Sequence, residues 1–354
     1  MTRKSLPLLK FQPILLPKPW GGDGLWRVLG KGRQEDVNIG ESWELSARSE
    51  ALTQVVEGPF AGKNLKDIVA LNGEELFGQP ASSSVFPLLY KFIYAREKLS
   101  VQVHPDPGSA LGESKTECWY VVDAAPGAEL IVGVSRHGRS REDILAALKS
   151  SHCEEVLRRW PAKRGDVFFI PAGTVHAITE GLLLYEVQQN SDTTFRLYDW
   201  GRVDGQGNPR PLHVEQAAEV ADLEEREGYK IEPLRVLRES HSEGYLVACP
   251  YFALVKWHGF RERASLEMPR KFCVVSVVSG SFEATTEDGQ GTALQLGDTM
   301  LIPASQERIH LEQMMPHSEL ILSFVPDLQT DIRAPLQTAG YSDGQIQRIF
   351  GPKI

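Results

Sequence analysis

The segment 100-SVQVHPDPGSALGESKTECWY-120 holds the first residues whose types and spacing could do chemistry. Valines alternate with Gln102 and His104, so a strand here would place the amide and the imidazole on one face. Glu117 follows a few residues later, just before a second apolar run with aromatics. Two ligand-type side chains at i and i+2, followed by a carboxylate, are the layout of a metal site inside a small barrel. The segment therefore predicts part of a metal centre.

A further candidate ligand comes from a pattern that occurs twice. The stretches 165-GDVFFIPAGTVHAI-178 and 297-GDTMLIPASQERIHL-311 both begin with Gly-Asp and continue through apolar residues to Ile-Pro-Ala. A Gly-Asp turn leading into a strand suits a jelly-roll hairpin. His176 in the first copy is matched by Arg308 in the second, and His310 lies two positions further on without a partner motif. The hairpin is repeated, whereas the candidate ligand is present once.

Gln102, His104, Glu117 and His176 together offer nitrogen and oxygen donors. Such a set suits zinc, and manganese, iron, nickel and cobalt are also compatible with it. The absence of a thiolate and the expected open position favour a catalytic over a structural site. The alternative is that the two histidines are ordinary polar residues at the ends of loops. The second hairpin, which lacks the histidine, favours the metal interpretation.

Composition narrows the class of protein. The 354 residues carry a formal net charge of −9, and the sequence pI is about 5.6, which argues against general nucleic-acid binding. No stretch is apolar for long enough to span a membrane, and prolines interrupt any signal-peptide core near the N-terminus. We expect a cytoplasmic protein. Four scattered cysteines form no CxxC pair, which suits a reducing compartment.

The elements that must position these residues are mostly short β-strands. Runs rich in Val, Ile, Phe and Tyr are broken by Gly and Pro, which predicts antiparallel sandwiches or barrels. Helix-like apolar spacing is found in three stretches: 63–78, 140–160 with Ser140 as a possible cap, and 213–226. The polar stretch that follows the third suggests a boundary near residue 235. We expect a mainly β protein with a few helices.

Longer motifs carry a resemblance to a known family. They include 40-GESWELS-46, 87-PLLYKFIYA-95, 99-LSVQVHPD-106, 115-KTECWYVVDA-124, 170-IPAGTVHAI-178 and 187-VQQNSDTTFRLYD-199. From about residue 19 to about residue 220, the chain resembles the short, bacterial-type mannose-6-phosphate isomerases, which are zinc enzymes of the cupin superfamily. The resemblance implies two jelly-roll cupin domains. Residues 1–235 would form a catalytic metal-binding domain with helical insertions, and residues 236–354 a cupin-like domain without metal.

The resemblance also implies roles for particular residues. His104, Glu117 and His176 match the zinc ligands of the family, and Gln102 matches a fourth ligand of the related longer enzymes, for one Zn²⁺ per chain. Arg196 matches an arginine that is treated as catalytic. Two departures stand out: Tyr94 replaces a common Asp, and Trp200-Gly201 replaces a more usual Tyr-Asp before Arg202. The second departure could alter the mouth of the site.

The implied reaction interconverts an aldose and a ketose phosphate by moving a proton between C1 and C2 through an enediolate. A metal and fixed cations would offset the negative charge that develops. Lys115 shares a face of the chain with Glu117 and could bind substrate or transfer a proton. The base is left open among Lys115, Glu44 and a metal-bound water. The cations available for a phosphate are Lys115, Arg196, Arg202 and Lys91, and the aromatic residues that could contact a sugar are Trp20, Trp43, Trp119 and Tyr120.

Two other functions fit the same residues. The site could isomerise an unphosphorylated sugar such as mannose, or the protein could be a regulatory cupin that binds a metal or a sugar without catalysis. A non-catalytic binder would need neither Arg196 nor Lys115, which disfavours it. An iron dioxygenase would usually offer more histidine ligands than His104 and His176. The oligomeric state is left open.

Overall fold

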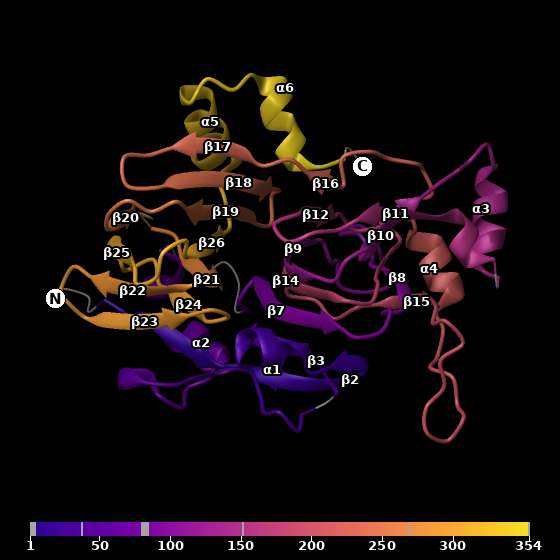
Figure 1. Cartoon of the computed structure of the whole chain (residues 1–354), viewed down its shortest axis with the longest axis horizontal. Helices are drawn as coiled ribbons and strands as arrows, with labels where there is room; N and C mark the ends of the chain where they lie inside the picture. The colour runs from indigo at the N-terminus through magenta and orange to yellow at the C-terminus, as the bar shows by residue number, and fades with distance from the viewer. Residues whose placement is uncertain (1–4, 37, 79–84, 151, 268–269, 353–354) are drawn as a thin grey trace.

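The computed structural model describes residues 5–36, 38–78, 85–150, 152–267 and 270–352. The polypeptide is mainly β, and its sheets form two units that lie side by side (Figure 1). Strands β8 to β15 lie in one unit, together with β2 and β3, and strands β17 to β26 lie in the other (Figure 1). The expected fold class, two cupin units with a few helices, is confirmed.

Two sheets form the first unit. The larger runs in the order β16 (Lys230–Ile231), β12 (Val167–Ile170), β9 (Glu117–Ala124), β14 (Leu182–Gln189), β7 (Leu88–Ala95), β3 (Ile39–Leu45) and β2 (Ile14–Gly22). The smaller runs in the order β11 (Leu157–Pro161), β10 (Glu129–Val134), β13 (His176–Ile178), β8 (Val101–Val103) and β15 (Phe195–Tyr198). A separate pair joins β4 (Ala47–Arg48) to β5 (Ala51–Leu52).

The second unit also has two sheets. One runs in the order β17 (Leu234–Leu237), β18 (Ser242–Ala248), β19 (Ala253–His258), β26 (Glu319–Phe324), β21 (Cys273–Ser279), β24 (Thr299–Ile302), β1 (Leu9–Gln12) and β6 (Gln54–Val55). The other runs in the order β20 (Ala264–Glu267), β25 (Arg308–Gln313), β22 (Ser281–Thr286) and β23 (Gly291–Gln295). Strands β1 and β6 come from the N-terminal part of the chain, so the division into residues 1–235 and 236–354 stays a proposal, with these strands attached to the second unit.

Most of the helices are short. They are α1 (Gly24–Leu29), α2 (Leu65–Phe77), α3 (Arg141–Leu148), α4 (Val214–Val220), α5 (Ala334–Thr338) and α6 (Asp343–Ile346), with single turns η1 (Gly58–Phe60), η2 (Cys153–Val156), η3 (Leu328–Arg333) and η4 (Gln347–Phe350). The predicted helix at 63–78 is confirmed as α2. The predicted cap at Ser140 is also confirmed, because its hydroxyl accepts the backbone N–H of Asp143 in a capping box.

The other two helix predictions were too long. The stretch 140–160 is helical only through Leu148, because residues from Leu157 pair with β10 as strand β11; Ser151 lies outside the described residues. The stretch 213–226 is helical only through Val220. There the backbone N–H of Asp222 donates to Gly173 O at 2.8 Å, so the chain is held by the turn between β12 and β13. In both places tertiary pairing overrides a local helical pattern.

The repeated Gly-Asp motif forms the same turn in both units. Gly165 and Gly297 have φ values of 88° and 86°, a region that glycine adopts without steric cost. Gly165 N–H donates to Val121 O at 2.8 Å, and Gly297 N–H donates to Val277 O at 2.9 Å. In each turn the Asp side chain accepts the N–H of the residue three positions earlier at 2.9 Å. These matched contacts make the two hairpins structural repeats.

Candidate metal centre and active site

Three predicted ligands meet at one point in the first unit. One ligand atom each from His104, Glu117 and His176 lies within 4.8 Å of the others, and all three residues are buried. His104 directly follows β8, Glu117 begins β9 and His176 begins β13. The two sheets of the first unit therefore both contribute to the cluster, since β9 belongs to the larger sheet and β8 and β13 to the smaller.

Hydrogen bonds fix the orientation of both imidazoles. His104 Nδ1 lies 2.8 Å from Thr193 O, and His176 Nδ1 lies 2.8 Å from Thr174 O. A carbonyl can only accept, so each Nδ1 carries the proton and each Nε2 presents a lone pair. Burial lowers the pKa of His176 to about 4 and lowers the pKa of His104 well below its usual value. Both imidazoles are therefore neutral near pH 7, which is the state that binds a metal.

The unprotonated Nε2 atoms of both imidazoles lie near the carboxylate of Glu117. His104 Nε2 lies 3.6 Å from Glu117 Oε2, and His176 Nε2 lies 3.3 Å from Oε1. Within the part of the chain that the structure describes, His104 Nε2 and Glu117 Oε1 are buried without a hydrogen-bond partner, and the contact of Glu117 Oε2 is the ammonium of Lys115 at 2.9 Å. Burial raises the pKa of Glu117 above its usual value. Electron pairs that converge in a buried space are satisfied by a cation, so these residues fit a divalent metal.

Gln102 lies beside this cluster, as the sequence predicted. Its backbone is paired with His176 across β8 and β13, and its Nε2 lies 3.2 Å from His176 Nε2. The amide oxygen accepts from the hydroxyl of Ser100 at 3.5 Å. To serve as a fourth ligand, the amide would have to turn its oxygen toward the cluster.

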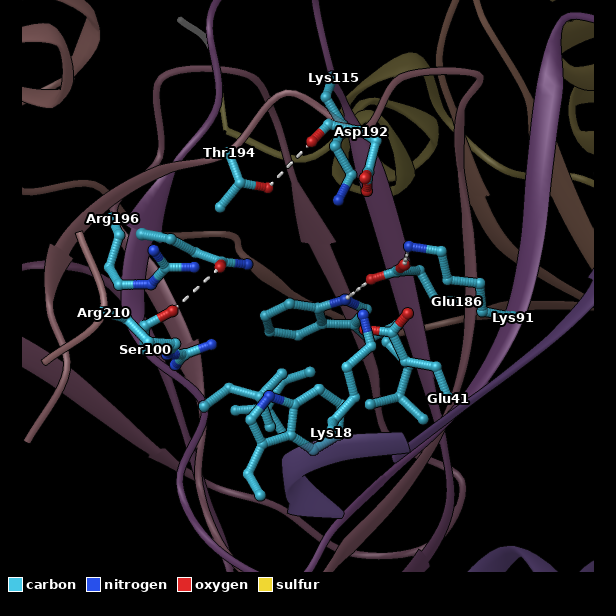
Figure 2. A pocket seen from close by; sticks show the side chains of 16 residues that line it. Lys18, Glu41, Lys91, Ser100, Lys115, Glu186, Asp192, Thr194, Arg196 and Arg210 are labelled. Atoms are coloured by element: carbon cyan, nitrogen blue, oxygen red, sulfur yellow. Dashed lines mark hydrogen bonds and ion pairs between the residues drawn. The ribbon is translucent and has the colours of Figure 1, made fainter. Parts of the chain in front are cut away.

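A cavity of about 320 Å³ adjoins the cluster (Figure 2). Gln102 and Lys115 line this cavity and also contact members of the cluster. The charged residues among its lining are the cations Lys18, Lys91, Lys115, Arg196 and Arg210 and the carboxylates Glu41, Glu186 and Asp192. Five cations and three carboxylates line the cavity, but Lys115 and Arg210 also pair with Glu117 and Asp199 outside the lining. Among the described residues, Arg196 is the lining cation without a carboxylate partner. The cavity therefore suits an anionic ligand.

Arg196 is the least neutralised cation of this wall. It lies on β15 directly across from Gln102, and its Nη1 donates to Pro211 O at 2.8 Å. Among the described residues it has no carboxylate within ion-pair distance, and its Nε is buried without a hydrogen-bond partner. Burial, and then the charge of Arg210, lower the pKa of Arg196 from its usual value, although a guanidinium stays charged at neutral pH. Arg196 and Arg210 lie together on one side of the cavity (Figure 2).

The other cations considered for a phosphate are placed differently. Lys91 lines the cavity, but its ammonium lies 3.3 Å from Glu186 Oε1. Arg202 does not line the cavity; its Nη1 lies 3.3 Å from Asp199 Oδ1. Lys91 is therefore already paired within the wall, and Arg202 is removed from it.

Lys115 and Glu186 carry opposite charges, and each influences the pKa of the other. Lys115 Nζ lies 2.9 Å from Glu117 Oε2, and although burial opposes the ammonium, Glu117 and Glu186 raise its pKa. Burial also opposes the carboxylate of Glu186, but Lys91 and Lys115 outweigh it and lower the pKa. At neutral pH Lys115 is thus protonated and Glu186 ionised. Of the two, Glu186 is the group that can accept a proton.

Glu44, the other carboxylate considered as a base, is not in the cavity. Strand alternation turns it to the face of β3 opposite to Glu41, where it accepts from Lys31 at 2.9 Å and Ser42 at 2.6 Å. Of the four aromatic residues considered for sugar contact, Trp20 and Trp119 line the cavity, whereas Trp43 and Tyr120 do not.

The sequence reasoning missed Glu186 and Arg210. Glu186 carried a usable signal, because it is the single charge within the apolar strand 182-LLLYEVQQ-189 and is paired in register with Lys91 of β7. Arg210 carried none, because it lies beyond β15 in a segment without secondary structure.

The second unit contains no equivalent cluster among the described residues. Arg308 points to exposed carboxylates, at 2.8 Å from Glu267 and 3.3 Å from Glu287. His310 Nδ1 lies 3.0 Å from the hydroxyl of Ser265. The repeated hairpin thus carries surface contacts at the positions where the first unit carries its ligand.

Comparisons with known proteins point to one family. The family description "Phosphomannose isomerase type I, catalytic domain" matches residues 8–135, and "Mannose-6-phosphate isomerase, cupin domain" matches residues 242–325. The chain is 37% identical over 299 residues to a mannose-6-phosphate isomerase of Streptococcus mutans, covering 83% of this chain and 92% of the relative. It is 36% identical to the mannose-6-phosphate isomerase ManA of Bacillus subtilis, covering 86% of this chain and 95% of that relative.

Solved structures agree with this assignment. The crystal structure of mannose 6-phosphate isomerase from Bacillus subtilis superimposes with a TM-score of 0.81 at 32% identity, over 90% of this chain and 99% of the other. The apo form of the enzyme from Salmonella typhimurium superimposes with a TM-score of 0.72 at 15% identity, over 90% of this chain and 99% of that one, and so supports the fold.

Proposed function

This chain belongs to the type I phosphomannose isomerases, and from that membership and the charged cavity we infer that it interconverts D-mannose 6-phosphate and D-fructose 6-phosphate. The observation that carries the proposal is the buried cluster of His104, Glu117 and His176, set against a cavity that contains a guanidinium without a carboxylate partner among the described residues. The reaction moves one proton between C1 and C2, and it is an aldose-ketose isomerisation.

We assign the metal site to His104, Glu117, His176 and Gln102, with zinc as the ion. Two neutral imidazoles and a carboxylate without a thiolate support this assignment, because zinc accepts this donor set in catalytic sites. A bound divalent ion would polarise the substrate oxygens and offset the charge of the enediolate. The second unit, whose described residues lack such a cluster, is assigned no metal.

The chain's own residues would divide the remaining work. Arg196, across from Gln102, would stabilise the negative charge that develops on the sugar, because its guanidinium is not neutralised by a carboxylate among the described residues. The carboxylate of Glu186, which lines the cavity, is the candidate that takes and returns the C1–C2 proton. Lys115, protonated and held by Glu117 at 2.9 Å, would donate a hydrogen bond to a substrate hydroxyl.

Arg210 is our candidate for the phosphate. It lines the cavity beside Arg196 and Ser100 (Figure 2). Arg210 Nε and Nη2 each donate one N–H to Asp199, which leaves Nη1 and the second N–H of Nη2 as parallel donors for a phosphate. Arg196, the lining cation without a carboxylate partner among the described residues, also favours a phosphorylated sugar over free mannose as the substrate.

The cellular location is a proposal as well. In the described part of the chain, no helix is long and apolar enough to cross a membrane. All four cysteines are free and buried, which supports a reducing, cytoplasmic compartment.

The substrate is tested by comparing mannose 6-phosphate with free mannose. Formation of fructose 6-phosphate is followed with a coupled assay, and formation of fructose is followed by chromatography. We expect kcat/KM for mannose 6-phosphate to exceed that for mannose by at least about a hundredfold, since a charge-assisted phosphate contact is lost with mannose. Equal turnover of both sugars would contradict the phosphate assignment, and no turnover of either would contradict the proposed function.

A further inference from the structure

The segment that follows β15 adopts an uncommon backbone conformation. Trp200 has φ of 57° and is followed by Gly201 with φ of 69°, so two consecutive residues are left-handed. Glycine adopts this conformation readily, whereas a bulky residue such as tryptophan does so at a steric cost. Such a conformation persists only where surrounding contacts hold it.

The contacts of this turn reach the residues that precede β8. Trp200 Nε1 donates to Leu99 O at 2.6 Å, and Arg202 Nη2 donates to Lys98 O. Lys98 Nζ in turn lies 4.6 Å from the centre of the Trp200 ring, within cation–π distance. The next residues along the chain are Ser100 and then β8, which carries Gln102 and leads to His104. The turn therefore holds the backbone directly before the strand of two proposed metal ligands.

Asp199 connects the same turn to Arg210, which lines the cavity. Its buried carboxylate accepts Arg202 Nη1 at 3.3 Å and takes two bonds from Arg210, at 2.7 Å from Nε and 2.6 Å from Nη2. Arg202 and Arg210 flank an exposed loop, closed by a bridge between Val203 and Pro209, that projects from the body below α4 (Figure 1). One carboxylate thus binds both legs of this loop, and one leg carries the guanidinium that lines the cavity.

We propose that Asp199, Trp200 and Arg202 form a clasp that sets the position of Arg210 relative to strand β8. These are positioning residues, because none of the three lines the cavity. Through Trp200 and Arg202 the clasp holds the residues before the metal strand, and through Asp199 it holds Arg210. The distance between the proposed phosphate contact and the proposed metal ligands is thereby fixed from outside the cavity.

The proposal rests on the proposed function, since it assumes that Arg210 contacts the substrate phosphate. It explains why Arg202 lies outside the cavity. The forked guanidinium of Arg202 bonds Asp199 with one arm and the Lys98 carbonyl with the other. A lysine has a single ammonium at this position and could not maintain both contacts in one geometry.

The test combines kinetics with hydrogen exchange on the full-length, metal-loaded protein. Asp199→Asn keeps the shape of the side chain and removes its charge, while Trp200→Phe keeps a ring and removes the Nε1 donor. Asp204→Asn is the matched control, because Asp204 lies in the projecting loop and, among the described residues, forms its hydrogen bonds with Gln206, Gly207 and Asn208 of the same loop. The exchange reporter is the amide of Leu99, which donates to Ile178 O at 2.8 Å.

For Asp199→Asn we expect KM for mannose 6-phosphate to rise about tenfold with kcat within about twofold of the parent, as the bonds that place Arg210 weaken. Inhibition by inorganic phosphate should weaken by a similar factor. Trp200→Phe should speed exchange at Leu99 by about tenfold, with a smaller change in KM. Asp204→Asn should match the parent enzyme in all three measurements.

Other outcomes would overturn the clasp. Unchanged KM and unchanged exchange in both variants would show that these contacts do not set the position of Arg210 or of the backbone before β8. A fall in kcat at constant KM would indicate loss of folded enzyme and a structural role alone. If the parent enzyme does not convert mannose 6-phosphate, the proposed function fails, while exchange at Leu99 still decides whether the turn holds the backbone before β8.

Discussion

At the centre of the site, the lone pairs of two buried imidazoles and one buried carboxylate point toward one another. Two imidazoles held by backbone carbonyls direct their free nitrogens at one carboxylate, and the only cation at hydrogen-bond distance from that carboxylate among the described residues is Lys115, at 2.9 Å. Such an arrangement would be repulsive without a positive charge between the ligands. The metal assignment therefore follows from the orientation of the side chains as well as from their types.

Replacing His176 with alanine should release most of the bound metal. The change removes one nitrogen donor from the cluster, and the loss of a single ligand lowers metal affinity by more than about tenfold. The measurement is metal content by elemental analysis after gel filtration. His152→Ala is the control, since the side chain of His152 is 68% exposed and its ion-pair partner in the described part of the chain is the exposed Glu155. Full metal content in His176→Ala would remove this residue from the ligand set.

Replacing Arg196 with alanine should leave the metal and the fold intact but lower kcat by about 10²- to 10³-fold, because a fixed charge that stabilises the transition state is lost. The assay is conversion of mannose 6-phosphate at saturating substrate, with metal content measured in parallel. Arg33→Ala serves as the matched control, because the Arg33 side chain is 78% exposed and lies far along the chain from the cavity residues of β15. An active Arg196→Ala enzyme would exclude a catalytic role.

At the scale of elements, the hairpin β12–β13 and strand β8 position most of the proposed metal ligands. Their register places His176, Gln102 and Arg196 in one row across β13, β8 and β15. Helices contribute little to the site directly, but α3 packs Ile144 and Leu148 into the buried cluster that also contains Val101 and Val103 of β8. The stability of α3 is thus linked to the support of the metal strand.

The cap of α3 gives a prediction with a defined pH dependence. Ser140→Ala should lower the free energy of unfolding by about 1 kcal/mol at pH 7, because the capping box loses its hydroxyl. Hydrogen bonds from Ser140 lower the pKa of Asp143, so this stabilisation is present above the ordinary aspartate pKa and is lost as the pH falls through the lowered value.

Urea denaturation at pH 7 and at about pH 3, followed by circular dichroism, measures this difference. Ser49→Ala is the control, since the Ser49 hydroxyl is exposed and donates to the neighbouring, exposed Glu50. An unfolding energy that is the same for Ser140→Ala and the parent at pH 7 would show that the cap does not stabilise the protein.

Local residue patterns predicted which side chains would lie together in the site, but they did not predict features that depend on contacts between distant segments. Alternation placed Gln102 and His104 beside each other, and the repeated hairpin singled out His176, because these signals are local. The strand at 157–161 was mistaken for helix, since its apolar spacing fits both forms and pairing with β10 decides between them. Arg210 could not have been predicted, because its place depends on bonds to Asp199 across the base of a loop.

At the scale of the whole molecule, the two units share one buried apolar cluster, and the N-terminal part of the chain adds strands β1 and β6 to a sheet of the second unit. Leu9 of β1 pairs with Leu301 of β24, so the beginning of the chain is part of the second unit's sheet. The second unit repeats the hairpin of the first but carries Arg308 where the first carries His176. The metal site is therefore expected once per chain.

The four cysteines give a prediction about the folded protein as a whole. All are buried, and burial raises the pKa of Cys153, Cys249 and Cys273 to about 12 and that of Cys118 well above its usual value. At pH 8 none should form a thiolate that a disulfide reagent can reach. We expect no reaction with Ellman's reagent in the native protein and four reactive thiols after denaturation. Rapid reaction of a native thiol would contradict this packing.

The central claim is that one buried metal, held by His104, Glu117 and His176, is required for isomerisation of mannose 6-phosphate. The most direct test measures metal content and turnover together, before chelation, after chelation and after addition of zinc. We predict one metal per chain, loss of turnover as the metal is removed, and recovery as one equivalent of zinc is restored. Full turnover by the metal-free protein, or a second tightly bound metal in each chain, would contradict the account.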